Sequence, residues 1–406
     1  MRLAIPAETA AGENRVAAVP ESVPLLVKLG LEVLVHAGAG DRSLAYDQAY
    51  RDAGALVLDA AEFRAALGSV QALACVQPPA PELLALLPIG ALTVSFLLPA
   101  GRPEVVLAAA DAHLSAMSFE LVPRISRAQS MDALTSQAFV AGYRAALVAA
   151  ELCPKFFPMF TTAAGTIRPA RVLVLGAGVA GLQAIATAKR IGGLVSAYDV
   201  RPASADEVRS MGAKFIDLGL DALEGSGGYA REMGPDRAKA QQDALAPFLA
   251  ASDVVITTAA VPGRPAPRLV TEEMLDTMSP GAVVVDLAAE TGGNVAGSVA
   301  GQLIERKGVR IWGARDVASQ LPVSASSLYA RNVVQLLGVV IKGGEVILDV
   351  NDEIVAGCLV THQGQVRHPL ARAALGLDSA PTVTAPTATA PTATAATQTA
   401  PNGEQG

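Results

Sequence analysis

Three glycines with the spacing Gly-x-Gly-x-x-Gly directly follow the apolar run Val172–Leu175. The first, Gly176, permits a tight turn, the second, Gly178, lets the backbone approach a pyrophosphate, and the third, Gly181, allows close packing of helix against strand. The expected helix, Leu182–Arg190, follows, and the free amide groups at its start, with Val179 and Ala180 just before it, favour phosphate charge. The pattern predicts a dinucleotide-binding loop with contacts from all five of these positions.

An acidic residue ends the next expected strand, Leu194–Tyr198. Asp199 stands 18 residues after Gly181, where a carboxylate accepts hydrogen bonds from the ribose hydroxyls and repels a 2′-phosphate. Arg201 could pair with such a phosphate instead, but Asp199 occupies the strand tip. We therefore expect NAD rather than NADP, with Val200 and Arg201 as further cofactor contacts.

A polar segment, residues 122–132, lies between two apolar elements. At about 100° per residue, Thr135 and Tyr143 lie close to Asp132 around a helix, and Gln129 joins them if the helix already begins there. Such a face could hold a ligand. It could equally be a capped helix start with a solvated face, and periodicity alone leaves both interpretations open.

The elements that must position these residues form two series of strands alternating with helices, which predicts parallel sheets covered on both faces. In the first series we expect strands at Arg2–Ile5, Glu32–His36, Ala72–Val76, Leu92–Leu97 and Leu114–Ser118, and helices at Ser22–Leu29, Tyr46–Ala53, Ala60–Leu67 and Pro103–Ala109. In the second we expect strands at Arg171–Leu175, Gly193–Tyr198, Lys214–Ile216, Val254–Thr257, Ala282–Asp286 and Val309–Trp312. The fold class is α/β, with doubly wound sheets.

Two long helices connect the series. One runs from Asp132 to about Phe157, and the other, about Ser324–Val340, returns the chain to the first domain. A hairpin of Glu345–Val350 and Glu353–Thr361 is expected to follow. We predict a discontinuous first domain (1–135 with 320–378), a Rossmann domain (136–319) and a disordered Pro/Thr/Ala tail (379–406), because that tail cannot bury enough apolar surface to fold.

Composition excludes several classes of protein. The 406 residues carry a net charge of −7, which argues against nucleic acid as a partner. No apolar run is long enough for a membrane span, and the N-terminus lacks a secretory signal. Cys75, Cys153 and Cys358 are too widely spaced for a disulfide framework or a zinc site. We expect a soluble cytoplasmic protein without a metal, its cysteines in the core.

One stretch is specific enough to indicate a family. Arg-Ile-Ser-Arg-Ala-Gln-Ser-Met-Asp at 124–132, followed by Ala-Gly-Tyr-Arg-Ala at 141–145, closely resembles the NAD(H)-binding component of proton-translocating nicotinamide nucleotide transhydrogenase. The resemblance covers almost everything from Met1 to about Pro369, including Gly176–Gly181, Gly227–Gly234, Thr257–Pro267 and Asp286–Ala288. It implies two Rossmann-like domains with NAD(H) in the cleft between them, and a homodimer.

The resemblance also implies roles for individual residues. The residues that would hold the nicotinamide for hydride transfer are Arg124, Gln129, Asp132, Thr135 and Tyr143, with Ile125, Ser126 and Arg127 as neighbouring cofactor contacts. The family more often carries Ser at the position of Thr135, and Thr keeps the hydroxyl. A mobile loop containing Gly228, Tyr229 and Met233 would close over the nucleotide, with Tyr229 acting in transfer. Gln241 and Ala260 match further contacts.

The sequence also resembles alanine dehydrogenase, which has the same architecture, and this resemblance includes the segment Asn14–Ala17. That family needs a substrate-binding lysine and a proton-donating histidine in its first domain. Here no lysine lies between Lys28 and Lys155, and no histidine lies between His36 and His113. Hydride transfer between two nicotinamides needs no general acid.

We therefore expect a transhydrogenase component that passes hydride between NADH and NADP⁺. The NADP(H) would be held by the NADP(H)-binding domain of the beta subunit, and separate transmembrane chains would couple transfer to proton translocation at the inner membrane. An alanine-dehydrogenase-like enzyme is the alternative, and a catalytically silent NAD(H)-binding regulator is a third possibility.

The sequence leaves the roles of two charged residues undecided. Arg15 could be a remnant of a shared ancestral site or a salt-bridging loop residue. Asp286 could touch a ligand or have a capping or structural role. The four histidines are scattered, and we expect no catalytic role for them.

Overall fold

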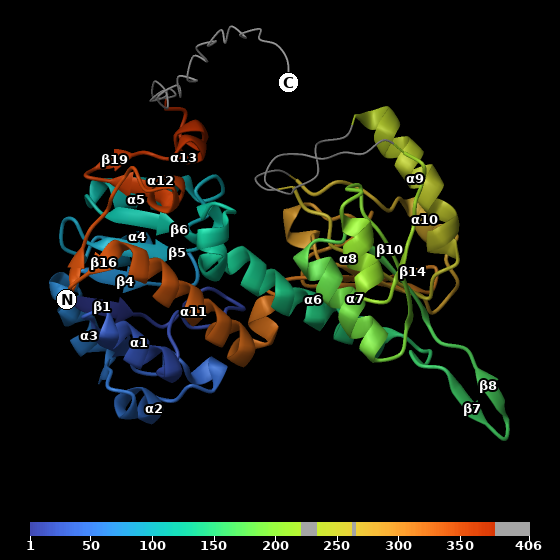
Figure 1. Ribbon diagram of the computed structural model, residues 1–406, viewed down its shortest axis with the longest axis horizontal. Helices are drawn as coiled ribbons and strands as arrows, with labels where there is room; N and C mark the ends of the chain where they lie inside the picture. Colours follow the sequence, from blue (N-terminus) through green and yellow to red (C-terminus); the bar gives the residue numbers. More distant parts are fainter. Residues whose placement is uncertain (221–233, 262–264, 378–406) are drawn as a thin grey trace, which may run out of the picture.

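The computed structural model describes residues 1–220, 234–261 and 265–377. Within these ranges the chain forms two α/β domains connected by two long helices (Figure 1). The expected tail, 379–406, lies outside the described residues. Two Rossmann-like domains with predominantly parallel sheets confirm the predicted fold class.

The first domain is built on an eight-stranded sheet. Its strands, in spatial order, are β3 (Leu56–Leu58), β2 (Glu32–His36), β1 (Arg2–Ile5), β4 (Ala72–Ala74), β5 (Leu92–Ser95), β6 (Ser115–Ser118), β18 (Leu359–His362) and β19 (Gln365–Val366). The first six are parallel in the order 3-2-1-4-5-6, and β18 joins β6 in antiparallel orientation. This is the doubly wound order of dinucleotide-binding sheets.

Helices cover both faces of this sheet, as strand alternation requires. Leu3 and Ile5 of β1 face α1 (Val23–Lys28) and α11 (Pro322–Val340). The intervening Ala4 faces the opposite core. That side is formed by α3 (Ala60–Ala66), α4 (Pro81–Leu84) and α5 (Pro103–Asp111), while α2 (Asp47–Asp52) precedes β3 and α13 (Pro369–Ala374) packs beside α5.

The second domain repeats this topology in seven strands. They are, in spatial order, β11 (Lys214–Phe215), β10 (Leu194–Tyr198), β9 (Arg171–Leu175), β12 (Val254–Thr257), β13 (Val283–Asp286), β15 (Val309–Gly313) and the antiparallel edge strand β14 (Leu303–Arg306). On one face lie α6 (Ala133–Leu152), α7 (Val179–Arg190) and α8 (Ser204–Ser210). On the other lie α9 (Pro235–Ala250) and α10 (Glu272–Asp276).

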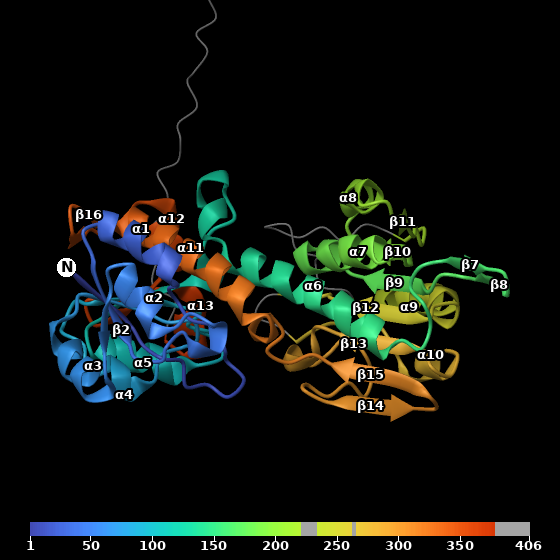
Figure 2. The ribbon, with the colours of Figure 1, turned by 90° about the horizontal axis from the view of Figure 1, so that it is seen from below.

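The chain crosses between the domains twice. The first crossing is α6, and the return passes through the 3₁₀ turn Ala318–Gln320 into α11, which packs against α6 (Figure 2). A hairpin of β7 (Phe160–Thr162) and β8 (Gly165–Ile167) extends away from the second domain in both views. All six of its strand residues are exposed.

The hairpin expected from Glu345–Val350 and Glu353–Thr361 is wrong. Glu345–Val346 (β17) pairs instead with Ile341–Lys342 (β16), and Glu353–Cys358 forms a helix, α12, before β18 begins. The Asp352 side chain accepts a hydrogen bond from the Ile354 amide at 2.8 Å, and this cap starts the helix.

Candidate dinucleotide-binding site

The glycine loop joins β9 to α7 as the sequence predicts. Gly176 has φ +98°, and Gly178 is the N-cap of the 12-residue helix α7. The first-turn amides at Val179 and Ala180 therefore point from a helix N-terminus, where backbone donors and the helix dipole favour a phosphate.

Each glycine of the loop meets a different steric constraint. A Cβ at Gly176 would lie 2.7 Å from Thr258 Oγ1, and one at Gly181 would lie 2.9 Å from the Gly176 carbonyl carbon. A Cβ at Gly178 would have no atom within 4 Å. The outer two glycines are thus required by packing, whereas the open side of Gly178 leaves room for a pyrophosphate. The chain therefore fits a bound dinucleotide at this loop.

Asp199 lies directly after β10, beside the loop. Its carboxylate accepts a hydrogen bond from the Ala177 amide at 2.7 Å, and Arg201 donates to it from its backbone and from its guanidinium at 2.9–3.0 Å. Arg201 therefore pairs with Asp199 at the position where a ribose would lie. Val200 is half-buried next to them.

The remaining predicted nucleotide contacts lie in different environments or outside the described residues. Gly228, Tyr229 and Met233 lie outside the described residues. Gln241 is buried on α9, and its Oε1 has no hydrogen-bond partner among the described residues. Ala260 is exposed in the segment after β12. A buried amide oxygen without a hydrogen-bond partner costs free energy, and a hydrogen-bond donor on a bound nucleotide would satisfy Gln241 Oε1.

The polar segment is a 3₁₀ helix, Ser126–Met131, and α6 begins only at Ala133. The premise that one helix already begins at Gln129 is wrong, because Asp132 has the non-helical ψ of 88° that an N-cap requires. The Asp132 carboxylate accepts hydrogen bonds from the Thr135 amide at 2.8 Å and from its hydroxyl at 2.6 Å. The capped helix start is therefore present.

Apart from the buried Ala128 and Met131, the other members of the segment from Arg124 onward are exposed or half-buried, and Tyr143 on α6 is also exposed. Arg124, Gln129 and Tyr143 are exposed, Ser126 is exposed, and Ile125 is half-buried. Arg127 forms a two-pronged ion pair with Asp352 at 2.8 and 3.1 Å, so its guanidinium fixes the segment to α12.

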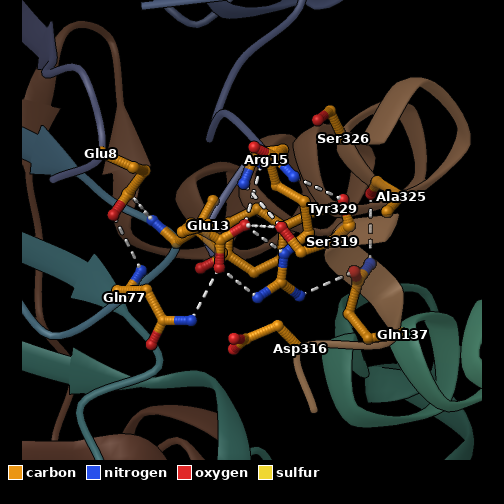
Figure 3. Close-up of polar contacts among 12 residues, drawn as sticks. Glu8, Glu13, Arg15, Gln77, Gln137, Asp316, Ser319, Ala325, Ser326 and Tyr329 are labelled. Atoms are coloured by element: carbon orange, nitrogen blue, oxygen red, sulfur yellow. Dashed lines mark hydrogen bonds and ion pairs between the residues drawn. The ribbon is translucent and has the colours of Figure 1, made fainter. Parts of the chain in front are cut away.

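Arg15 lies in a buried polar cluster in the first domain (Figure 3). Its guanidinium donates to both carboxylate oxygens of Glu13, at 2.7 and 2.5 Å, and to Gln137 Oε1 at 2.9 Å. Burial opposes ionisation of Glu13, but the hydrogen bonds from Arg15 outweigh it and hold the pKa of that carboxyl below its usual value. Arg15 is therefore a salt-bridging loop residue.

Glu8 lies beside this cluster and accepts hydrogen bonds from the Val76 and Gln77 amides. Burial raises the pKa of Glu8 to about 7. The cavity between Glu8 and Arg15 has a volume of about 40 Å³, too small for a metabolite.

The segments Cys75–Pro78 and Phe96–Pro99, where the lysine and histidine of an alanine dehydrogenase would be expected, contain neither residue, and Gln77 there donates to Glu13 Oε2 at 2.7 Å. Cys75 and Phe96 are buried, Phe96 packs on Tyr329 at a ring-centre distance of 5.5 Å, and the Tyr329 hydroxyl donates to the Cys75 carbonyl at 2.7 Å. All three cysteines are buried, as predicted.

Asp286 has a structural role. It is fully buried and accepts hydrogen bonds from the Thr257 hydroxyl and from the Ala288, Asn294 and Val295 amides at 3.0–3.2 Å. Asn294 in turn bonds the Ala259 amide and carbonyl, which shapes the segment that carries Ala260. Sequence reasoning missed Asn294, since nothing local distinguishes it.

Among residues 1–220, 234–261 and 265–377, no group of three or more His, Cys, Asp or Glu side chains could hold a metal ion. No helix in these ranges has the length and apolarity to cross a membrane.

Fold and loop together define a two-domain doubly wound protein with a Rossmann-type glycine loop. A family model described as alanine dehydrogenase/PNT, N-terminal domain, matches residues 4–141, and its counterpart, the C-terminal domain, matches residues 145–369. The chain belongs to the alanine dehydrogenase/PNT family.

Its relatives favour one branch of that family. The first part of NAD(P) transhydrogenase subunit alpha of Rhodospirillum rubrum is 44% identical over 379 residues, covering 91% of this chain and 98% of the relative. The crystal structure of transhydrogenase from Sinorhizobium meliloti superposes with a TM-score of 0.79 at 44% identity, over 91% of this chain and 99% of that one. Alanine dehydrogenase of Mycobacterium tuberculosis is 32% identical over 307 residues, covering 73% of this chain and 75% of the relative. These findings confirm the resemblance drawn from the sequence.

Proposed function

We propose that this chain is the NAD(H)-binding subunit of a proton-translocating transhydrogenase. In this role it positions NADH for hydride transfer to NADP⁺ held by a partner subunit. The observation that carries the proposal is the glycine loop of the second domain, with open space at Gly178 and Asp199 at the neighbouring strand tip. NAD(H), when bound, supplies the hydride that is transferred.

The chain's own residues would bind and orient that cofactor. The α7 N-terminus would hold the pyrophosphate, and Asp199 would accept hydrogen bonds from the ribose. Because α6 packs directly on α7, the capped start of α6 places Asp132 and Thr135 on the same rigid helix that supports the loop. We assign Arg124 and Gln129, which are exposed just before that helix start, and Tyr143, which is exposed further along α6, to the nicotinamide end. Tyr229 and Met233 would close over the nucleotide.

The first domain supports transfer between two nicotinamides better than reduction of a carbonyl. A carbonyl or imine needs a general acid next to the hydride acceptor. Neither Cys75–Pro78 nor Phe96–Pro99 contains a lysine or a histidine, and burial raises the pKa of the Cys75 thiol well above its usual value. The Arg15 charge is already matched by Glu13, so it offers no uncompensated cation for a substrate carboxylate.

The partners follow from the same reasoning. One strong dinucleotide loop serves one nucleotide, so NADP(H) would arrive on the NADP(H)-binding domain of a beta subunit. Separate membrane chains would carry the proton pathway and hold this chain at the cytoplasmic side of the inner membrane. The projecting β7–β8 hairpin exposes Phe160 and Ile167, with Phe156 and Met159 exposed at its base. This apolar arm favours a homodimer.

Mixing the purified chain with an NADP⁺-loaded partner domain and NADH, and following NADPH formation, tests the proposal. We expect rapid formation of NADPH and no NADH oxidation by pyruvate and ammonia without the partner. Robust oxidation by pyruvate and ammonia would establish the alanine-dehydrogenase alternative instead. NADH binding without transfer to a correctly folded partner would indicate a silent regulator.

A further inference from the structure

A relay of hydrogen-bonded side chains, buried at Arg15, Gln137 and Asn332, connects the Glu13–Arg15 pair to the 3₁₀ segment Ser126–Met131. From Arg15 the relay continues to Gln137, whose Nε2 donates to the Ala325 carbonyl and to Ser136 Oγ, both at 3.1 Å. Gln137 is 7% exposed, and Figure 3 shows its side chain between Arg15 and the Ala325 carbonyl, with a hydrogen bond to each.

The relay continues into α11. Ser136 Oγ donates to Asn332 Oδ1 at 2.7 Å, and Asn332 Nδ2 donates to the Ser130 carbonyl at 2.9 Å. Asn332 is 6% exposed. One amide therefore uses its acceptor on α6 and its donor on the 3₁₀ segment.

The carbonyl of Ser130 lies between two residues assigned to the nicotinamide end. Gln129 precedes it, and Asp132 follows two positions later. A 3₁₀ helix has weaker internal hydrogen bonds than an α-helix, and within this one only Ala128 and Met131 are buried. The segment thus depends on outside contacts for its position, and Asn332 is a buried one.

We propose that Asn332, supported by Ser136 and Gln137, is a positioning residue that fixes the 3₁₀ segment and thereby Gln129 and Asp132 for hydride transfer. The expected effect on hydride transfer rests on the proposed function, whereas the expected effect on the position of the 3₁₀ segment follows from the contacts alone. Asn332 acts through the Ser130 backbone and touches neither cofactor nor reacting atoms. A misplacement of about 1 Å at a reacting centre costs on the order of a hundredfold in rate.

The test compares Asn332→Leu with Thr361→Val. Leucine fits the buried site without either hydrogen bond. Thr361→Val removes two similarly buried hydrogen bonds of the first domain, from Thr361 Oγ1 to the Leu114 carbonyl at 2.9 Å and from the Ala116 amide to Thr361 Oγ1 at 3.3 Å, and neither involves the segment. Asn332→Asp is the second variant, because it keeps the acceptor for Ser136 and loses the donor to Ser130.

Two measurements are made on the full chain. Amide hydrogen exchange of residues 126–131, without nucleotide, is expected to accelerate about tenfold in both Asn332 variants and not in Thr361→Val. The single-turnover rate of hydride transfer to the NADP⁺-loaded partner domain is expected to fall tenfold or more, with the Kd for NADH within about twofold of the parent.

Each outcome decides a different statement. Unchanged exchange in both Asn332 variants overturns the positioning role, whatever the rates are. Faster exchange with an unchanged rate, or a Kd that rises as much as the rate falls, overturns positioning for transfer. If the parent chain itself transfers no hydride, the proposed function fails, and the exchange data alone decide whether Asn332 fixes the segment.

Discussion

The packing of α6 on α7 leads to a quantitative prediction at Gly142. A Cβ placed there would lie 2.9 Å from the Cα of Ala180 and 2.8 Å from its carbonyl carbon, whereas ordinary contact begins at 3.4 Å. The obstacle is backbone, so it cannot rotate away. In Gly142→Ala the two helices must therefore separate by roughly 1 Å, which moves the first turn of α7 that follows the glycine loop.

The size of the effect is set by two opposing contributions. Overpacking costs typically about 1–3 kcal/mol, and a backbone obstacle favours the upper end. Alanine regains roughly 1 kcal/mol over glycine in helix propensity. We expect a net destabilisation of about 2 kcal/mol, which for a domain of this size lowers the Tm by about 4–8 °C.

Gly178→Ala is the matched control. Gly178 has an ordinary φ of −78°, and its Cβ would enter open space, so the Tm should stay unchanged or rise slightly. NADH affinity should nevertheless fall at least about tenfold, since the methyl group occupies the side open to a pyrophosphate. Thermal unfolding and fluorescence titration with NADH measure both effects. A Gly142→Ala protein with the parent's Tm and affinity would refute the steric argument.

Four further changes test other regions of the structure. Because burial raises the pKa of Glu8 from 4.5 to about 7, its contribution to stability is complete below pH 4.5 and is lost as the pH rises through 7. Glu8→Gln should therefore reduce the change in the free energy of unfolding between pH 5 and 8, by at most about 3 kcal/mol. If denaturant titrations gave the variant the same change in this free energy with pH as the parent, the argument would be contradicted. Asp199→Ala should narrow the gap between the Kd values for NADH and NADPH by calorimetry, and equal Kd values in the parent would contradict the specificity argument. Asp286→Asn can keep an acceptor at Oδ1 but places an NH2 group against the Val295 amide, a donor facing a donor, and should destabilise the chain by about 1–3 kcal/mol, which chemical denaturation would disprove if the midpoint did not move. Gln129→Asn should lower the transfer rate far more than NADH affinity, and the reverse pattern in stopped-flow data would assign Gln129 to binding alone.

The sequence predicted the elements whose signal is local. The glycine loop and most parallel strands are apolar runs bounded by turn residues, and β1, β2, β9 and β12 begin and end where expected. The sequence did not predict β3, which is only half-buried, or the edge strand β14, which alternates exposed and half-buried residues. The prediction of a hairpin between Glu345–Val350 and Glu353–Thr361 was wrong, because the Asp352 cap starts a helix at Glu353.

The residues of the candidate site also separate into those that local sequence predicts and those that depend on tertiary packing. The loop and Asp199 follow from spacing within one βαβ unit, and the outward-facing nicotinamide residues stay predictions from the resemblance. Asn332 could not be found from sequence, because it meets Ser130 across 202 positions of the chain. Its role depends on the packing of α11 against α6, and no local pattern records that packing.

The discontinuous sheet of the first domain sets an order for folding during synthesis. Strand β18 pairs Leu359 with Met117, and α11 covers the face formed by β1 and β2. The sheet closes only when the last fifth of the chain has been made, whereas the second domain is one continuous insertion that is complete earlier. On the ribosome we therefore expect the second domain to mature first, although it comes later in the sequence. Meanwhile the emerging first domain exposes the apolar surface that α11 will cover, which is the state a nascent-chain chaperone binds.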